Sequence, residues 1–284
     1  MARRKIMDGA VYALIGLSAG ISVALLVGIL FYVLGKGAGT ISWEFLSTVP
    51  SSLKGTFGIA GNLLNTLYMI LITLLLATPI GVGSAIYLNE YAHPGKLVRF
   101  IEFTTETLSG IPSIIFGLFG MVFFGNFFHL GYSILTGALT LTLMVLPLIT
   151  RNTQEALKTV PESYRTGAMG IGATKWYMIR TVLLPSAMPG MITGVILSIG
   201  RIVGESAALL FTAGSGYLLP KSAMGYLDKV LEPGGTLTIQ LYLCMSKAEY
   251  DKAFGIALVL LVIVLCINAL TKVLARQYDV TRKE

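Results

Sequence analysis

Two charged residues lie in the middle of an apolar stretch of the chain. Arg201 and Glu205 are four residues apart within the run from about 187 to 211, which is long enough to cross a hydrocarbon core as a helix. Ionised groups are costly in hydrocarbon, so both side chains should face a protein interior or a water-filled path. A guanidinium can donate two parallel hydrogen bonds to an oxyanion such as phosphate. The pair is therefore a candidate site for an anion that crosses the membrane.

Two interpretations of this pair remain open. In the first, Arg201 contacts the anion, and Glu205 holds the guanidinium when no anion is present or weakens the attraction so that the anion leaves. In the second, the two residues form an ion pair one helical turn apart that serves helix packing only. Ser198 and Ser206 could add hydroxyl groups near the path, although hydroxyls in spans mostly bond to their own helix.

The sequence shows no other group of residues arranged for catalysis or metal binding. It lacks the GxxxxGK[ST] motif that cradles the phosphates of ATP. His93 and His129 stand alone, and Cys244 and Cys266 have neither metal-ligand nor disulfide spacing. We expect a chain without a catalytic residue, metal or cofactor.

The composition predicts an all-α membrane protein that positions this pair in a helical bundle. Of the 284 residues, 55% are hydrophobic and only 12% charged, whereas soluble domains usually have about 25% charged residues. The net charge of +7 then indicates basic loops at a membrane rather than a nucleic-acid partner. Because the first apolar run exceeds a signal-peptide core, we expect it to be retained. The six predicted spans are 10–34, 62–88, 105–128, 132–150, 187–211 and 253–275.

The distribution of basic residues predicts the orientation. With six spans, both termini lie on one side, and 14 of the 21 Lys and Arg residues lie on that side, against six on the other. The positive-inside rule then puts both termini in the cytoplasm. We expect segments 35–61 and 212–252 to lie on the outer side, together with a tight outer turn at 129–131. The segment 212–252 should be solvated and irregular. The longest inner segment, 151–186, is expected to be helical from Pro161 onward.

Segment 160–185 resembles the "EAA" loop of ABC importer permeases, whose frame is Glu-Ala-Ala, three residues, Gly, nine residues and Ile-x-Leu-Pro. The second Ala, the Gly and the final Leu-Pro are matched here, and Val182 stands in the Ile position. The resemblance implies a short coupling helix that docks on an ATPase subunit. Thr166 and Gly167 replace the Glu and the first Ala, so Glu162, one turn earlier, could face the ATPase instead. An interfacial helix without a partner is the alternative. The expected coupling residues are Glu162, Arg165, Thr166, Gly167, Ala168, Gly172 and Pro185.

Two further stretches, 108–120 and 194–214, resemble phosphate-import permeases of the PstA type, and the resemblance extends over about residues 56–275. It implies a type I ABC importer (MetI-like) permease fold and a non-catalytic subunit. It also implies two ATP-binding cassette ATPases that bind ATP and Mg, a PstC-type second permease, and a phosphate-binding protein that delivers inorganic phosphate. The alternatives are a permease for molybdate or sulfate, and an ion-coupled secondary transporter or channel in which Arg201 and Glu205 relay protons or anions.

Overall fold

The computed structural model describes residues 2–51, 55–220 and 222–277 and is built from helices. Within these ranges the only extended pairing is the isolated bridge between Ser51 and Thr56, so the all-α prediction is confirmed. Four basic residues of the charge count, Lys54, Lys221, Arg282 and Lys283, lie outside the described residues.

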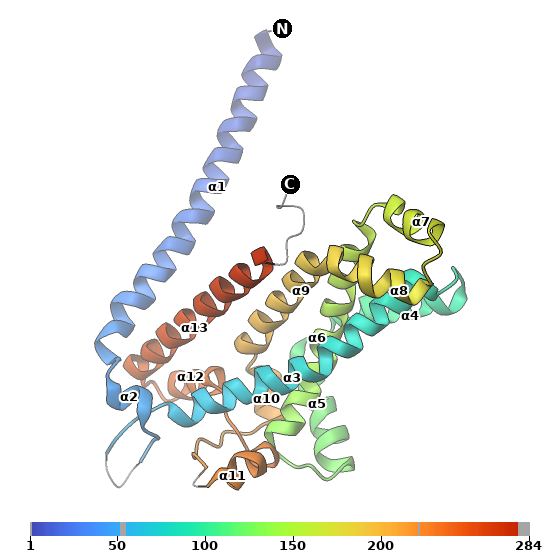
Figure 1. Ribbon diagram of the computed structural model, residues 1–284. Helices are drawn as coiled ribbons and strands as arrows, with labels where there is room; N and C mark the ends of the chain where they lie inside the picture. Colours follow the sequence, from blue (N-terminus) through green and yellow to red (C-terminus); the bar gives the residue numbers. More distant parts are fainter. Residues whose placement is uncertain (1, 52–54, 221, 278–284) are drawn as a thin grey trace.

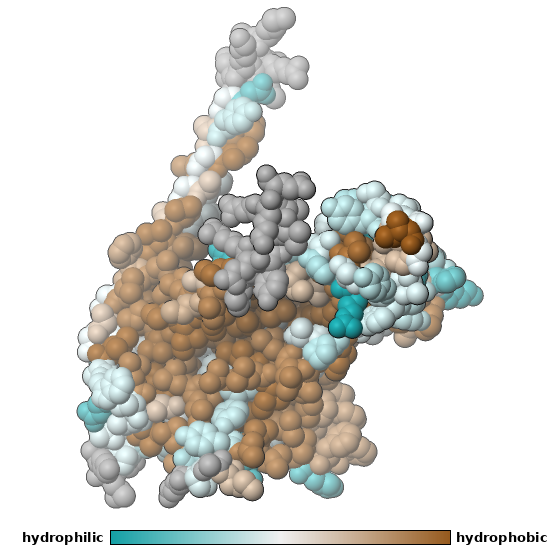
Figure 2. Space-filling view, in the orientation of Figure 1, coloured by the Kyte–Doolittle hydropathy of each residue, from teal (hydrophilic) through white to brown (hydrophobic). Residues whose placement is uncertain are grey.

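Five of the described helices are long and apolar enough to cross a membrane. They form a hydrophobic belt between two more hydrophilic ends of the molecule (Figure 2). A sixth span results if a bent helix pair is counted as one. The five helices are α1 (Ala2–Gly37), α3 (Ala60–Ile86), α6 (Ile134–Lys158), α9 (Leu184–Gly204) and α13 (Tyr250–Gln277).

The bent pair replaces the single helix predicted at 105–128. Helix α4 (Lys96–Gly110) ends before Pro112, and α5 (Ser113–Gly120) continues into the π-helical turn η3 (Met121–Phe127). The chain bends by 103° between these two parts. Ile111 has extended dihedral angles (φ −72°, ψ 130°), as expected for a residue before proline, which is disfavoured in the helical region. The stretch predicted as the third span therefore contains a break at Ile111 and Pro112 rather than one continuous helix.

The predicted helix 187–211 is also interrupted. Helix α9 ends at Gly204, and α10 (Ala207–Thr212) begins after two non-helical residues. The following segment, which is predicted to lie outside, contains α11 (Ala223–Asp228), η5 (Lys229–Leu231) and α12 (Leu237–Ser246). Helix α12 is apolar and buries Leu237, Ile239 and Cys244, so the prediction of a wholly solvated, irregular segment is wrong.

The core lies where α3, α6 and α9 pack together, and glycines allow these helices to approach closely. A Cβ atom on Gly81 of α3 would lie 2.8 Å from Ile149 of α6, and one on Gly194 of α9 would lie 2.7 Å from Asn152. Gly200 and Gly204, in contrast, face open space. Small residues therefore mark a packing face of α9 at Gly194 but not at Gly200 and Gly204.

Segment 151–186, which the charge bias predicts to be cytoplasmic, is largely helical, as expected, but its helices belong partly to the spans. Helix α6 extends to Lys158, and α7 (Glu162–Gly170) begins after Pro161. Helix α8 (Lys175–Met178), the π-helical turn η4 (Ile179–Leu183) and α9 form one rod of 30 residues. Pro185 lies inside this rod rather than at its boundary. Helix α7 is thus a separate short helix between two brief non-helical connections.

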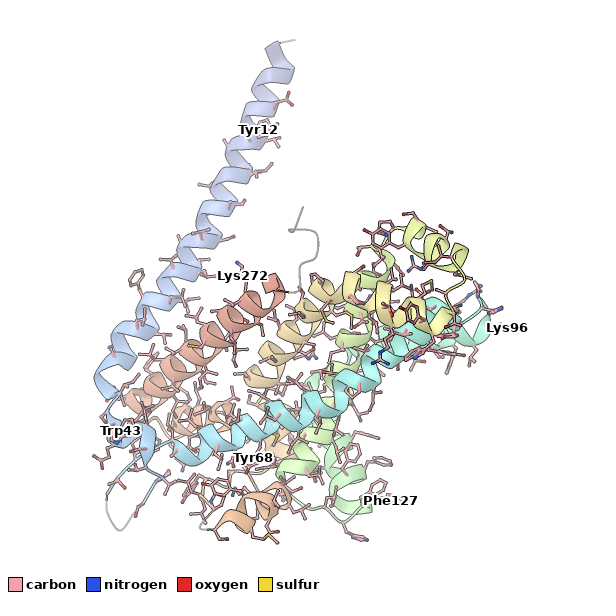
Figure 3. The ribbon with its side chains drawn as sticks, viewed as in Figure 1. Tyr12, Trp43, Tyr68, Lys96, Phe127 and Lys272 are labelled. Carbon is pink, nitrogen blue, oxygen red and sulfur yellow. The ribbon has the colours of Figure 1, made fainter. Side chains whose placement is uncertain are left out.

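The two ends of the molecule differ in the segments that they carry. The start of α1 and the end of α13 lie toward the end that carries α7, whereas α2 (Trp43–Ser47) and α11 lie at the opposite end (Figure 1). Lys96 and Lys272 lie toward the α7 end, and Trp43 and Phe127 toward the other (Figure 3). This arrangement agrees with an even number of crossings.

Helix α1 stands away from the rest of the bundle (Figure 1), and its apolar window is 0% buried. It touches α13 near its C-terminal end, where the rings of Tyr32 and Phe254 are 5.5 Å apart and Gly37 approaches the Phe254 carbonyl. The 3₁₀ turn η1 (Ala38–Thr40) and α2 follow. Most of the apolar surface of α1 therefore has no partner among the described residues.

Candidate substrate path and coupling helix

Arg201 lies in the last turn of α9 on the exposed side of the helix. Thr193, Leu197, Gly200 and Gly204 share this open stripe, whereas the neighbours on the other side of α9 are buried in the core. Across the described residues, no hydrogen bond or ion pair is formed by the Arg201 side chain, so its charge is available to a group outside this chain.

Glu205 points to a different partner. Its Oε1 accepts a hydrogen bond from the Ala208 amide at 3.0 Å and so caps the first turn of α10. The chain leaves the helix after Glu205 (φ −79°, ψ 127°), and this turn brings the amides at the start of α10 within reach of the Glu205 carboxylate. The Arg201–Glu205 ion pair of the second interpretation is therefore not formed in the described structure, and Glu205 stabilises the break in the fifth span.

Thr238 of α12 completes this break. Its hydroxyl lies 3.0 Å from the Val203 carbonyl and 3.1 Å from the Glu205 carbonyl, two acceptors that the end of α9 leaves without helical partners. Sequence reasoning missed Thr238, because nothing local relates it to residues more than 30 positions away. Ser198 is buried and donates to Gly194 of its own helix, so it does not face the open stripe.

On α7, the expected coupling residues divide into an outer and an inner set. Glu162, with 75% of its side chain exposed, faces outward with Thr166 and Gly167. Ala168 and Arg165 turn toward the bundle, and only 14% of the Arg165 side chain is exposed. Its guanidinium contacts Glu90 at 3.0 Å and Glu162 at 3.2 Å. Arg165 therefore belongs to the internal attachment of α7 rather than to its outer surface.

The Arg165 guanidinium remains charged in this partly buried position. Burial opposes the charge, but hydrogen bonding and attraction by Glu90, with a smaller contribution from Glu162, raise the pKa of Arg165 above its ordinary value. Glu90 is the partner that sequence reasoning missed, since it lies 75 positions earlier, on the π-helical turn η2 (Tyr87–Tyr91) that ends α3.

The end of α7 is encoded locally. Gly172 has φ +87°, a left-handed conformation that favours glycine, and its amide donates to the Met169 carbonyl at 3.0 Å. The Ala173 amide donates to the Ala168 carbonyl at 3.1 Å. Thr174 then accepts a hydrogen bond from the Tyr177 amide and caps α8. Gly172, one of the expected coupling residues, therefore acts in the structure that ends α7.

The surface of α7 and α8 carries large apolar side chains at the hydrophilic end of the molecule. Ile171 is 88% exposed, and Met169 and Trp176 are each 57% exposed. Hydrophobic patches stand out on this otherwise hydrophilic region (Figure 2). Exposed apolar clusters of this kind commonly mark protein interfaces. Over the described ranges, no group of three or more His, Cys, Asp or Glu residues could hold a metal ion.

The all-helical bundle, with a broken fifth span and a separate helix at one end, is similar to solved ABC importers. The chain matches a bacterial alginate ABC transporter, solved in complex with an alginate pentasaccharide-bound periplasmic protein, with a TM-score of 0.69. That match has 15% identity and covers 96% of each chain. An inward-facing MetNI methionine ABC transporter matches with a TM-score of 0.59 and 21% identity, over 78% of this chain and 94% of that one. The chain therefore has the helical fold of MetI-like ABC importer permeases.

The sequence places the chain in a family. Residues 77–280 match the family described as "Binding-protein-dependent transport system inner membrane component", and the chain belongs to that family of multi-pass membrane permeases. A probable ABC transporter permease protein, YqgI of Bacillus subtilis, is 42% identical over 74% of this chain and 72% of its own length. The phosphate transport system permease protein PstA 2 of Mycobacterium bovis is 32% identical over 93% of this chain and 86% of its own length. Membership in this family argues against the secondary-transporter alternative.

Proposed function

We propose that this chain is a permease subunit of an ATP-driven phosphate importer and that Arg201 contacts the anion during its passage. The observation that carries the proposal is the unpaired Arg201 on the open stripe of a membrane-crossing helix. A charge left uncompensated in lipid would be costly, so it should face water, an anion or a second protein. The similarity to permeases named for phosphate transport supports phosphate as the anion.

The open stripe on α9 is suited to form one wall of a path. Gly200 and Gly204 leave room beside Arg201, and the position near the helix C-terminus favours a cation. Because one exposed helix face does not enclose a path, a second permease subunit, of the PstC type, would supply the other wall. The unburied α1 supports the presence of such a partner.

The outer surface of α7 would dock on an ATPase subunit. Two ATPase copies would bind ATP and Mg and hydrolyse ATP, while this chain contributes no catalytic group. Glu162, Thr166 and Gly167 would lie at that contact together with the exposed Ile171 and Met169. A phosphate-binding protein would deliver its ligand to the opposite end of the molecule. ATP-driven closure of the ATPases would then favour the outward-open state, and hydrolysis the inward-open state.

The test is phosphate uptake by the reconstituted complex with Arg201→Ala. We expect uptake to fall about ten- to a hundredfold, which corresponds to the loss of a charged hydrogen bond. Arg201→Lys should retain part of the uptake because it keeps the charge but loses the planar fork. Arg180→Ala serves as the control, since Arg180 is exposed on the same rod near the cytoplasmic end. Complex assembly should be unchanged in all three variants.

Wild-type uptake by Arg201→Ala would refute the contact between Arg201 and substrate. Selectivity is measured in the same assay by adding sulfate or molybdate as competitors. Stronger competition by either anion than by unlabelled phosphate would identify the chain as a permease for another oxyanion.

A further inference from the structure

The attachment of α7 to the bundle depends on very few side chains. Helix α7 has no buried residue, and only Arg165 and Ala168 are even partly covered. Ala168 touches the apolar cluster formed by residues such as Leu157 and Met178, but a methyl group buries little area. The forces that position this helix must therefore come mainly from Arg165.

The Arg165 guanidinium uses all its N–H donors within the protein. Nε and Nη2 donate to Glu90 Oε1 at 3.4 and 3.0 Å, and Nη2 also donates to the Leu157 carbonyl at 3.0 Å. Nη1 donates to the Val160 carbonyl at 3.1 Å and to Glu162 at 3.2 Å. Leu157 lies in the last turn of α6 and Val160 lies just beyond its end, a position where carbonyls lack α-helical partners and favour a cation. One side chain thus joins α7 to the ends of α3 and α6.

Glu90 is the one acidic partner in this joint that α7 does not itself supply. Its side chain is 5% exposed, and Oε1 also accepts a hydrogen bond from Asn89 at 2.7 Å. Next to it, the Lys175 ammonium lies 4.9 Å from the centre of the Tyr91 ring, so α8 also contacts η2. A pocket of about 470 Å³ lies here, and its lining includes Glu90, Lys175, Lys158 and Met169. Polar contacts rather than dense packing therefore hold α7 against α3.

We propose that Glu90 is a positioning residue that makes α7 move together with the cytoplasmic end of α3. This role rests on the proposed function, in which α7 receives the motion of an ATPase. Helix α3 packs along α6 and α9, so the Glu90–Arg165 contact supplies a route from α7 to the core that does not pass through the rod 175–204. In the absence of this contact, less of the motion of α7 would reach α3.

The first test is hydrogen exchange of the amides in 162–170, measured on the purified chain in lipid nanodiscs. We expect exchange about tenfold faster in Glu90→Leu and a smaller increase in Glu90→Gln, whose carbonyl can still accept from Arg165. Glu155→Gln is the matched control, because Glu155 pairs with Lys158 at 3.1 Å at the same end but is 64% exposed. Exchange that matches wild type in both Glu90 variants would overturn the proposal.

The second test uses the complete complex and compares phosphate uptake with ATP hydrolysis. A positioning role predicts that Glu90→Gln lowers uptake per ATP hydrolysed while the amount of assembled complex is maintained. A role in fold stability alone would lower assembly, hydrolysis and uptake together, and that result would overturn the proposal. If the wild-type complex hydrolyses ATP but transports no phosphate, the proposed substrate is wrong, while the exchange measurement still decides the role of Glu90.

Discussion

At the scale of single residues, the Glu205 carboxylate holds the first turn of α10, and Arg201 is left without a partner in the described structure. We therefore expect Glu205→Ala to lower the free energy of unfolding by about 1 kcal/mol, the usual loss for a helix cap. Arg201→Ala should leave that free energy nearly unchanged. Chemical denaturation of both purified variants in detergent measures the difference. An equal loss in the two variants would show that the residues act as a pair.

At the scale of elements, the stop at the end of α7 depends on the left-handed backbone at Gly172, whose φ is +87°. Gly172→Ala should destabilise the end of α7 by about 1–2 kcal/mol, because a Cβ atom is disfavoured in that conformation. Gly167→Ala is the matched change inside the helix, where alanine should be favoured over glycine by about 0.5–1 kcal/mol. Hydrogen exchange of 162–173 should therefore become faster in the first variant and slower in the second. A change of the exchange rate in the same direction in both variants would contradict this explanation.

At the scale of the whole molecule, the bias of basic residues predicts that α7 lies in the cytoplasm and that segment 212–252 lies outside. This orientation can be tested with single cysteines at Thr166 and Leu218, both exposed, after Cys244 and Cys266 are replaced by alanine. In intact cells, a maleimide that cannot cross membranes should label position 218 only. Label at position 166 should appear after the cells are opened. The reverse pattern would require the opposite orientation.

The sequence by itself determined the apolar helices, the boundaries of α7 and the presence of an unusual charge in the fifth span. These features depend on hydropathy, proline, glycine and caps, which act over a few neighbouring residues. Only the tertiary structure decided which groups the charges contact. Arg165 meets Glu90 across 75 positions, and Thr238 reaches the break at Glu205 across 33. Such partners depend on how the chain folds back and how helices pack. The turn after Glu205 brings the Ala208 amide of α10 to the Glu205 carboxylate, and Arg201 is left without that partner.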